Sequence, residues 1–149
     1  IGVASQALGI AQAALDEATS YAKERKAFGK PIAKLQAIQW MLADSATELE
    51  ASRVLVMRAA ALKEAGEPFT NEASMAKVYG TEFFVELYRL LLEVMGQAGT
   101  IVSDSPGAIL KGKLEFRYRV GSVLTFGGGA NEVQRDIIAM AGLWMPRTR

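Results

Sequence analysis

Residues 34–65 form a long uninterrupted stretch that contains no glycine and no proline. Its apolar residues recur every three to four positions, which predicts one continuous helix: Leu35, Ile38, Leu42, Ala46, Leu49, Val54, Met57 and Ala61. Such a helix spans about 48 Å at 1.5 Å per residue, and Gly66-Glu67-Pro68 ends it. A domain of 149 residues accommodates a helix this long most readily as one rod of a bundle.

Two further segments carry the same helical signals. Residues 2–25 repeat small and apolar residues at helical spacing, and a glycine and a proline in 26–33 then predict a turn. Another helix is expected to begin at a cap formed by Thr70 or Asn71 and to continue to about Met95. The small residues of the first helix favour close packing against its neighbours.

The last third of the chain predicts shorter pieces. A loop is expected at 96–107, a short helix over 107–117, and a last helix from Asn131, as its N-cap, to Ala141. Val120–Phe126 is rich in β-forming residues but is too short to build a sheet alone. The lengths and brief connections therefore predict an all-α fold, an up-and-down four-helix bundle.

The amino-acid composition of the chain excludes several kinds of catalytic and binding site. The chain contains no cysteine and no histidine, so disulfides, thiol nucleophiles, imidazole bases and ordinary zinc sites have no residues to form them. The net charge of +1 gives no basic field, and we expect no nucleic-acid partner. We also expect no membrane span, because no apolar run approaches the necessary length of roughly 20 residues.

Three consecutive glycines, Gly127, Gly128 and Gly129, precede the last predicted helix. They could form a phosphate-binding loop, since backbone N–H groups at a helix start suit an anion. They could equally be a plain turn, because the lysine and serine or threonine of a P-loop are missing. A third interpretation is that a catalytic side chain is absent at this position.

A group of cations ends the first helix. Arg25, with Lys23, Lys26 and Lys30, could simply complement the helix dipole. The alternative is phosphate recognition, for which the planar fork of arginine is suited. An aromatic ring at Phe28, three residues after Arg25, would suit a nucleotide that offers both a phosphate and a base.

Amide and carboxylate groups on the long helices are less informative. Gln36 and Gln39 share a helix face and could contact a ring or ribose edge, or could be solvated. Two pairs of glutamates resemble carboxylate metal ligands, but without an E-x-x-H motif a di-iron bundle is not indicated. We expect these four glutamates to pair with lysine or arginine at the surface: Glu48, Glu50, Glu82 and Glu86.

The run Y-A-K-E-R-K-A-F-G-K-P-I-A-K-L-Q-A-I-Q resembles the acyl-CoA dehydrogenase family, as do E-A-S-M-A-K and N-E-V-Q-R-D-I-I-A. The resemblance covers essentially all of residues 1–149, as the C-terminal helical domain of a longer protein. It implies FAD as cofactor and oxidation of an acyl-CoA substrate to the trans-2-enoyl-CoA. In that reaction a carboxylate takes the α-proton and flavin N5 takes the β-hydride.

The resemblance also implies partners and a location. Electrons would pass to an electron-transferring flavoprotein, and the bundle would form the core of a homotetramer or heterotetramer in which it contacts a neighbouring subunit's FAD. The expected location is the bacterial cytoplasm, or the mitochondrial matrix for a eukaryotic protein.

Carried over by position, the resemblance implies a set of cofactor contacts. Arg25 would meet the FAD pyrophosphate, and Phe28 and Gln36 would lie near the adenosine part. The family's Q-I-x-G-G turn falls on residues 93–97, and its T-S-E turn falls on residues 130–132. The remaining expected contacts are Glu93, Gly96, Gln97, Asn131 and Glu132.

One departure concerns the catalytic base. Many members of the family carry a glutamate base where this chain has Gly128, so the resemblance assigns no catalytic residue here. Two explanations stay open. Some members place the base on the first helix of this domain, upstream of Ile1. Alternatively, this chain is a non-catalytic partner subunit or a structural bundle of a heterotetramer.

Overall fold

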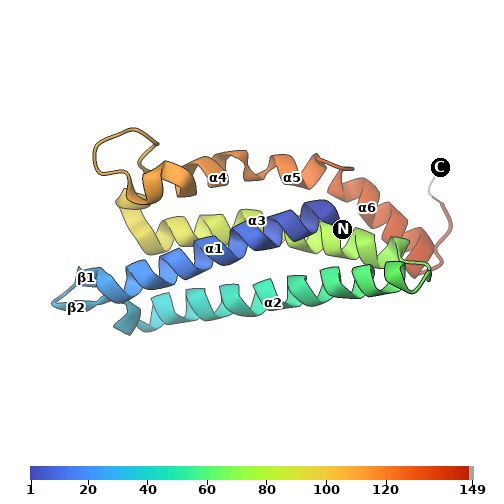
Figure 1. Ribbon diagram of the computed structural model, residues 1–149, viewed down its shortest axis with the longest axis horizontal. Helices are drawn as coiled ribbons and strands as arrows, with labels where there is room; N and C mark the ends of the chain where they lie inside the picture. The colour runs from blue at the N-terminus through green and yellow to red at the C-terminus, as the bar shows by residue number, and fades with distance from the viewer. Residues whose placement is uncertain (148–149) are drawn as a thin grey trace.

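Three long helices lie side by side in the computed structural model, which describes residues 1–147 (Figure 1). They are α1 (Gly2–Glu24), α2 (Gln36–Glu64) and α3 (Thr70–Met95). Gly66, with φ +75°, helps to turn the chain between α2 and α3. These bounds confirm the three long helices predicted from glycine, proline and apolar spacing.

The fourth rod of the bundle is broken into pieces. It consists of α4 (Lys113–Gly121), α5 (Val123–Phe126) and α6 (Asn131–Ile137), and the last of these continues as a π-helical turn (Ile138–Gly142). α4, α5 and α6 all pack along α3. The predicted all-α, up-and-down four-helix bundle is therefore confirmed. One of the breaks in its fourth rod falls at the three glycines, residues 127–129.

The short helix predicted over 107–117 begins later than expected. Leu110 and Lys111 adopt left-handed backbone conformations, with φ +53° and +56°, and a 3₁₀ turn at Ile109–Gly112 precedes α4. A Cβ atom on Gly112 would lie 2.2 Å from the backbone nitrogen of Ser103, so this close crossing requires glycine. The β-forming run at Val120–Phe126 is helical, because it packs on α3 and no strand lies beside it.

A two-stranded hairpin connects α1 to α2. β1 (Lys26–Ala27) pairs antiparallel with β2 (Lys30–Pro31), and a 3₁₀ turn (Ile32–Lys34) leads into α2. Phe28 and Gly29 occupy the two central turn positions with φ +53° and +75°. Two successive positive φ angles are the geometry of a type I′ turn.

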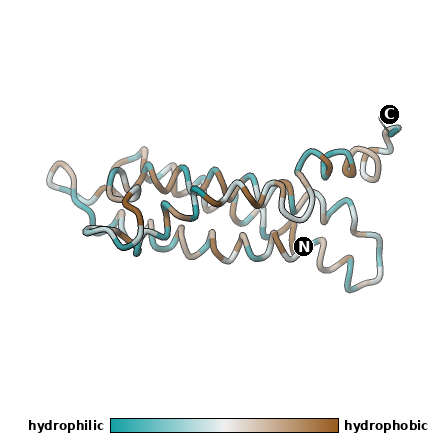
Figure 2. The backbone as a smooth tube through the Cα atoms, turned by 90° about the horizontal axis from the view of Figure 1, so that it is seen from above, coloured by the Kyte–Doolittle hydropathy of each residue, from teal (hydrophilic) through white to brown (hydrophobic). Residues whose placement is uncertain are grey.

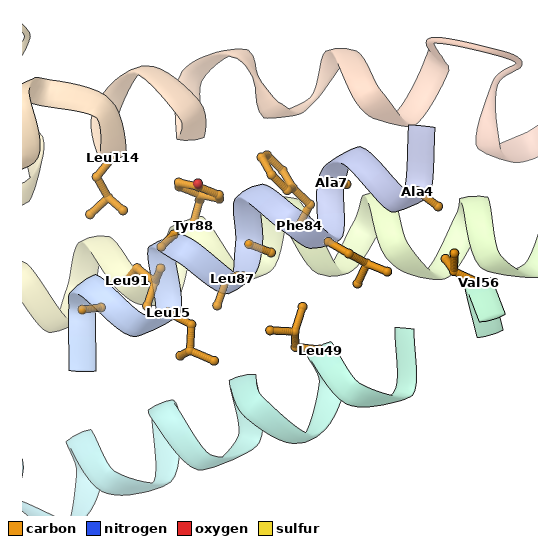
Figure 3. Close-up of a cluster of buried hydrophobic side chains, with 14 of the residues drawn as sticks. Ala4, Ala7, Leu15, Leu49, Val56, Phe84, Leu87, Tyr88, Leu91 and Leu114 are labelled. Atoms are coloured by element: carbon orange, nitrogen blue, oxygen red, sulfur yellow. The ribbon is translucent and has the colours of Figure 1, made fainter. Parts of the chain in front are cut away.

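The core forms where the small residues of α1 meet the large residues of α3 (Figure 3). α1 contributes buried alanines at helical spacing: Ala4, Ala7, Ala11, Ala14 and Ala18. Opposite them, α3 contributes Phe84, Leu87, Tyr88 and Leu91, and Phe84 and Tyr88 stack with ring centroids 4.7 Å apart. Each fully buried leucine stabilises the fold by roughly 1.5–3 kcal/mol.

α2 buries only part of its apolar pattern. Its buried residues are Ser45, Leu49, Ser52, Val56 and Ala59. Val54 and Met57, which belong to the same pattern as Leu49, are 57% and 63% exposed. Apolar residues line both sides of the second half of α2, so their periodicity predicts the helix there without identifying its buried face. Hydrophilic and hydrophobic positions alternate along the long helices (Figure 2).

The expected cap of α3 is also absent. Phe69 occupies the N-cap position without a side-chain hydrogen bond, so neither Thr70 nor Asn71 caps the helix. The Oδ1 atom of Asn71 is buried and has no hydrogen-bond partner among the described residues. A Cβ atom on Gly142 would lie 2.3 Å from this oxygen, which shows how closely the π-helical turn packs on the start of α3.

Candidate functional site

A groove of about 750 Å³ opens at the hairpin end of the bundle, and we call it the hairpin groove. It is bounded by the end of α1, the end of α3 and the turn that follows α3. Four of the residues predicted to contact FAD line it: Arg25, Glu93, Gly96 and Gln97. The fold therefore brings together residues that are far apart in the sequence and were predicted from separate motifs.

The position of Arg25 is determined by its backbone. Its N–H donates to the carbonyl of Tyr21 at 2.8 Å and so ends α1, and its carbonyl accepts from the N–H of Ile32 at 2.8 Å where the chain returns from the hairpin. Its guanidinium forms neither a hydrogen bond nor an ion pair with any residue in the described part of the chain. Arg25 is exposed and lines the groove, so its five N–H donors are available to a ligand there.

The opposite wall is the end of α3. Gly96 adopts φ +60° and ψ −148°, a conformation that L side chains rarely adopt, and turns the chain into a 3₁₀ helix (Gly96–Thr100). Glu93 pairs with Arg89, which also pairs with Glu86 at 2.6 Å. The hydrogen bond from Arg89 lowers the pKa of Glu86. Glu93 therefore shares its charge with Arg89 rather than with Arg25.

Two more predicted contacts lie at the same end of the molecule. Phe28 is 93% exposed at the tip of the hairpin, in the left-handed conformation given above. Gln36 is the first residue of α2 and is exposed, and its amide has no hydrogen-bond partner among residues 1–147. The neighbouring Gln39 instead donates to the carbonyl of Ala33 at 2.9 Å. An exposed ring and an unpartnered amide thus lie at the same end of the bundle as the groove.

The three glycines form a turn between α5 and α6, which we call the glycine turn. Gly127 is extended, whereas Gly128 and Gly129 have φ +73° and +110°, so two left-handed glycines make the turn. The turn leads into α6 without the lysine and serine or threonine of a P-loop. A Cβ atom on Gly128 would lie 3.6 Å from Cγ2 of Val3, in the first turn of α1. Gly128, the position at which the family resemblance predicts a base in other members, therefore borders the start of α1.

Asn131 was predicted to cap the last helix, and this is wrong. Ala130 occupies the N-cap position and no side chain caps α6. Asn131 is 2% exposed, and its amide donates to Oγ1 of Thr81 at 3.1 Å and to Oε1 of Glu82 at 3.0 Å. Its side chain points into the bundle because α3 offers these partners, while Glu132 stays exposed.

Lys77 on α3 completes this buried network and was not singled out by the sequence. It is 6% exposed, and its ammonium donates to Oδ1 of Asn131 at 2.5 Å and to the carbonyl of Thr125 at 2.8 Å. Burial lowers the pKa of Lys77, against the opposing charges of Glu132 and Glu82. Its helical spacing from the buried residues of α3 is the signal that could have identified it.

The glutamates considered as metal ligands mostly form surface ion pairs, as predicted. Glu50 pairs with Arg53 at 3.0 Å, and Glu82 pairs with Arg135 at 2.7 Å. Glu48 departs from the prediction and accepts a hydrogen bond from Tyr79, which raises the pKa of that tyrosine. Within the described residues no three acidic side chains gather as a metal site.

The eight predicted contacts therefore fall into two groups along the bundle (Figure 1). Arg25 and the residues of the α3 end line the hairpin groove, and Phe28 and Gln36 lie at the same end of the bundle, whereas Asn131 and Glu132 lie at the glycine turn, beside the middle of α3. Thr81, the partner of Asn131, and Glu93 are about 18 Å apart along α3 at 1.5 Å per residue.

Comparison with known proteins identifies the family. The family described as "Acyl-CoA dehydrogenase, C-terminal domain" matches residues 1–143. The mitochondrial short-chain specific acyl-CoA dehydrogenase of Bos taurus is 45% identical over 139 residues, which are 93% of this chain and 32% of that protein. Subunit CarC of the caffeyl-CoA reductase-Etf complex of Acetobacterium woodii is also 45% identical over 139 residues, 93% of this chain and 35% of that protein.

Among solved structures, the ChsE4-ChsE5 complex from Mycobacterium tuberculosis contains a chain that matches with a TM-score of 0.87 at 39% identity, over 93% of this chain and 36% of that chain. The chain belongs to the acyl-CoA dehydrogenase family, a family of flavoprotein oxidoreductases, and corresponds to its C-terminal domain. It spans about a third of the length of these relatives. Among the described helices, none is long and apolar enough to cross a membrane.

Proposed function

We propose that this chain is the C-terminal domain of an FAD-dependent acyl-CoA dehydrogenase and that its hairpin groove receives the pyrophosphate part of FAD. The observation that carries this proposal is the unpaired guanidinium of Arg25 in a groove shared with Gly96 and Gln97. A planar guanidinium binds phosphate oxygens in bidentate fashion. Glycine at position 96 allows a ligand to approach the backbone closely.

The flanking residues fit the rest of the cofactor. The exposed ring of Phe28 offers a stacking surface for a purine, and the free amide of Gln36 offers donors and an acceptor for adenosine. Backbone strain at Phe28 supports a binding role, since left-handed non-glycine residues concentrate at ligand sites. When bound, FAD would supply the acceptor for the hydride that leaves the acyl chain.

The separation of the two groups supports a cofactor shared between subunits. The hairpin groove of one copy and the glycine turn of another would meet the same FAD, with Asn131 contributing backbone because its side chain is engaged internally. Such sharing requires at least two copies, and we propose the tetramer that the family resemblance implies. The exposed apolar residues on the outer face of α2, such as Trp40, Val54 and Met57, offer a surface for it.

The neighbourhood of Gly128 bears on the catalytic base. Because a side chain at position 128 would touch Val3, a carboxylate one turn before Val3 on a continuing α1 would reach the same space. We therefore favour a base on the segment that precedes α1. The alternative is a heteromer in which another chain supplies the base, and one matched structure is a complex of two differently named chains.

The physiological partners follow from the same proposal. An acyl-CoA thioester would be the substrate, and an electron-transferring flavoprotein would accept the electrons. The CarC relative is named as a subunit of a complex that contains Etf. We propose the bacterial cytoplasm as the location, or the mitochondrial matrix in a eukaryote. The acyl chain is the part of the substrate for which the described residues offer no specific contact.

The substitution Arg25→Ala in the full-length protein tests the proposed cofactor site. We expect FAD affinity to fall by about tenfold or more, because a charge-assisted bidentate contact contributes at least that much. Flavin absorbance per subunit after gel filtration measures it. The matched control is Lys63→Ala, an exposed cation at the end of α2, far along the bundle from the groove. Equal flavin content in both variants would overturn the assignment.

Addition of an acyl-CoA to the flavin-loaded protein separates the two explanations for the base. Bleaching of the flavin in a homo-oligomer supports a base within the same polypeptide. Bleaching that requires a second, different chain supports the heteromer. A full-length protein that never retains flavin would contradict both and favour a structural bundle.

A further inference from the structure

The glycine turn should be the most mobile part of the fourth rod, yet both of its flanks are held. Glycine loses more conformational freedom on ordering than any other residue, and here three stand in succession. The described backbone contact of the turn is one hydrogen bond, from the N–H of Gly127 to the carbonyl of Val123 at 2.8 Å. The other restraint comes from α3.

That restraint is a single side chain. The ammonium of Lys77 donates to the carbonyl of Thr125, which precedes the glycines, and to Oδ1 of Asn131, which follows them. One charged group therefore bridges the two sides of the turn from a third element. Thr81 and Glu82 hold Asn131 from its other side, so this anchor is fixed as well.

We infer that Lys77 is a positioning residue whose ammonium clamps both flanks of the glycine turn and holds the turn against the start of α1. Its relevance to the cofactor rests on the function proposed above; the clamp itself does not. Lys77 acts through Thr125 and Asn131 and touches no substrate or cofactor in this assignment.

The cost of burying a charge favours this interpretation over simple packing. An ammonium taken out of water is expensive even when it is paired, and an apolar side chain of similar volume commonly fills such a position as well or better. Methionine could occupy the same space between α3 and α6 without that cost. What methionine could not provide is directional donors for two acceptors on opposite sides of a turn.

Hydrogen–deuterium exchange on the full-length protein tests the clamp directly. In Lys77→Met we expect the hydrogen-bonded backbone amides on the two sides of the turn, those of Gly127 and Gln134, to exchange faster by about tenfold or more, the factor that loss of a hydrogen bond to a charged group implies. Amides of α2 should be unchanged. Lys63→Met is the matched control, because Lys63 is exposed in the last turn of α2. Unchanged exchange at Gly127 and Gln134 would overturn the inference.

A second readout distinguishes positioning from bulk stabilisation. In the flavin-loaded protein, Lys77→Met should shift the visible absorption band of bound FAD, whereas Lys63→Met should not. Faster exchange with an unchanged band would overturn the positioning role toward the cofactor. A wild-type protein that binds no flavin would overturn the proposed function, and the exchange experiment alone would then decide the clamp.

If Lys77→Met does not fold, Asn131→Ala keeps the inference testable. It removes one anchor and leaves the bond from Lys77 to Thr125. Exchange should then increase by a similar factor at the amide of Gln134 and stay unchanged at the amides of Thr125 and Gly127. Uniform faster exchange on both sides of the turn would contradict a two-sided clamp.

Discussion

The hairpin end of this bundle and the region of the glycine turn treat polar groups in opposite ways. At the hairpin end, the guanidinium of Arg25 and the amide of Gln36 are exposed and have no partners among the described residues. At the glycine turn, Lys77, Thr81 and Asn131 are buried and bonded to one another. Unpartnered charge in an open groove is available to a ligand, whereas paired charge under a turn determines where the backbone lies.

Replacement of Asn131, whose side-chain amide lies at the centre of the buried network under the glycine turn, should lower the free energy of unfolding the most. Asn131→Leu leaves Lys77 and Glu82 without one partner each, and we expect it to lower the free energy of unfolding by about 2–4 kcal/mol. Thermal or urea unfolding of the full-length protein measures this. The control is Gln39→Leu, whose hydrogen bond to Ala33 is exposed and should contribute less than about 1 kcal/mol. Similar losses of stability in both variants would contradict the distinction between the glycine turn and the hairpin end.

The stability of the fold at alkaline pH should report the tight packing of α3 between the glycine turn and the hairpin groove. Burial raises the pKa of Tyr88 to about 12 from its ordinary value of 10.0. The folded state therefore holds this proton more tightly, and the associated stability is present below pH 10 and lost as the pH rises through about 12. The loss is on the order of 2–3 kcal/mol at most.

The variant Tyr88→Phe should therefore have a flatter stability profile between about pH 10 and pH 12 than the wild type. Tyr79, whose pKa is also raised, is present in both proteins and cancels in the comparison. Parallel profiles would indicate that Tyr88 is more accessible to solvent than its burial beside Phe84 indicates.

Placing a carboxylate at position 128, where the family resemblance predicts the base of other members, should strain the glycine turn. Gly128 has φ +73°, so Gly128→Glu forces an L side chain into a left-handed conformation at a cost of about 1–2 kcal/mol. Gly128→Asn should lose less, because asparagine tolerates this conformation better. Melting temperatures of the two variants give the comparison, and equal values would show that the turn relaxes freely.

The smallest effect is expected from the surface pairs near the hairpin groove. Glu86→Gln removes a bond to Arg89, but both side chains are about half exposed and Arg89 keeps Glu93. We expect a loss of less than about 0.5 kcal/mol. Chemical unfolding measures this loss of stability. A loss near that of Asn131→Leu would mean that the region of the hairpin groove is held as rigidly as the glycine turn.

The sequence predicts where the three long helices begin and end, but it does not predict which face of α2 is buried. Glycine and proline stop helices by local sterics, so the ends of α1, α2 and α3 follow from the chain alone. The buried face of α2 did not, because Ser45 and Ser52 lie in the core while Val54 and Met57 lie outside. Which apolar side faces inward depends on the neighbouring helices, and a single periodic pattern contains no information about them.

The candidate site divides in the same way. Arg25 and Gln97 could be predicted because their motifs are local, and the fold then placed them in one groove. Asn131 was found but misassigned, since helix-cap preference cannot anticipate partners on α3. Lys77 was overlooked because a lysine on a long helix is usually solvated, and its burial is a property of tertiary packing.

The turn that presents Phe28 has a consequence for protein engineering. Glycine or asparagine would adopt the left-handed conformation at position 28 with less strain than phenylalanine. A selection for heat-resistant variants, scored without cofactor, should therefore enrich those residues at position 28. Variants recovered in this way would have improved melting temperatures and an impaired purine-stacking surface, so a thermostability campaign on this domain needs flavin retention as a second criterion.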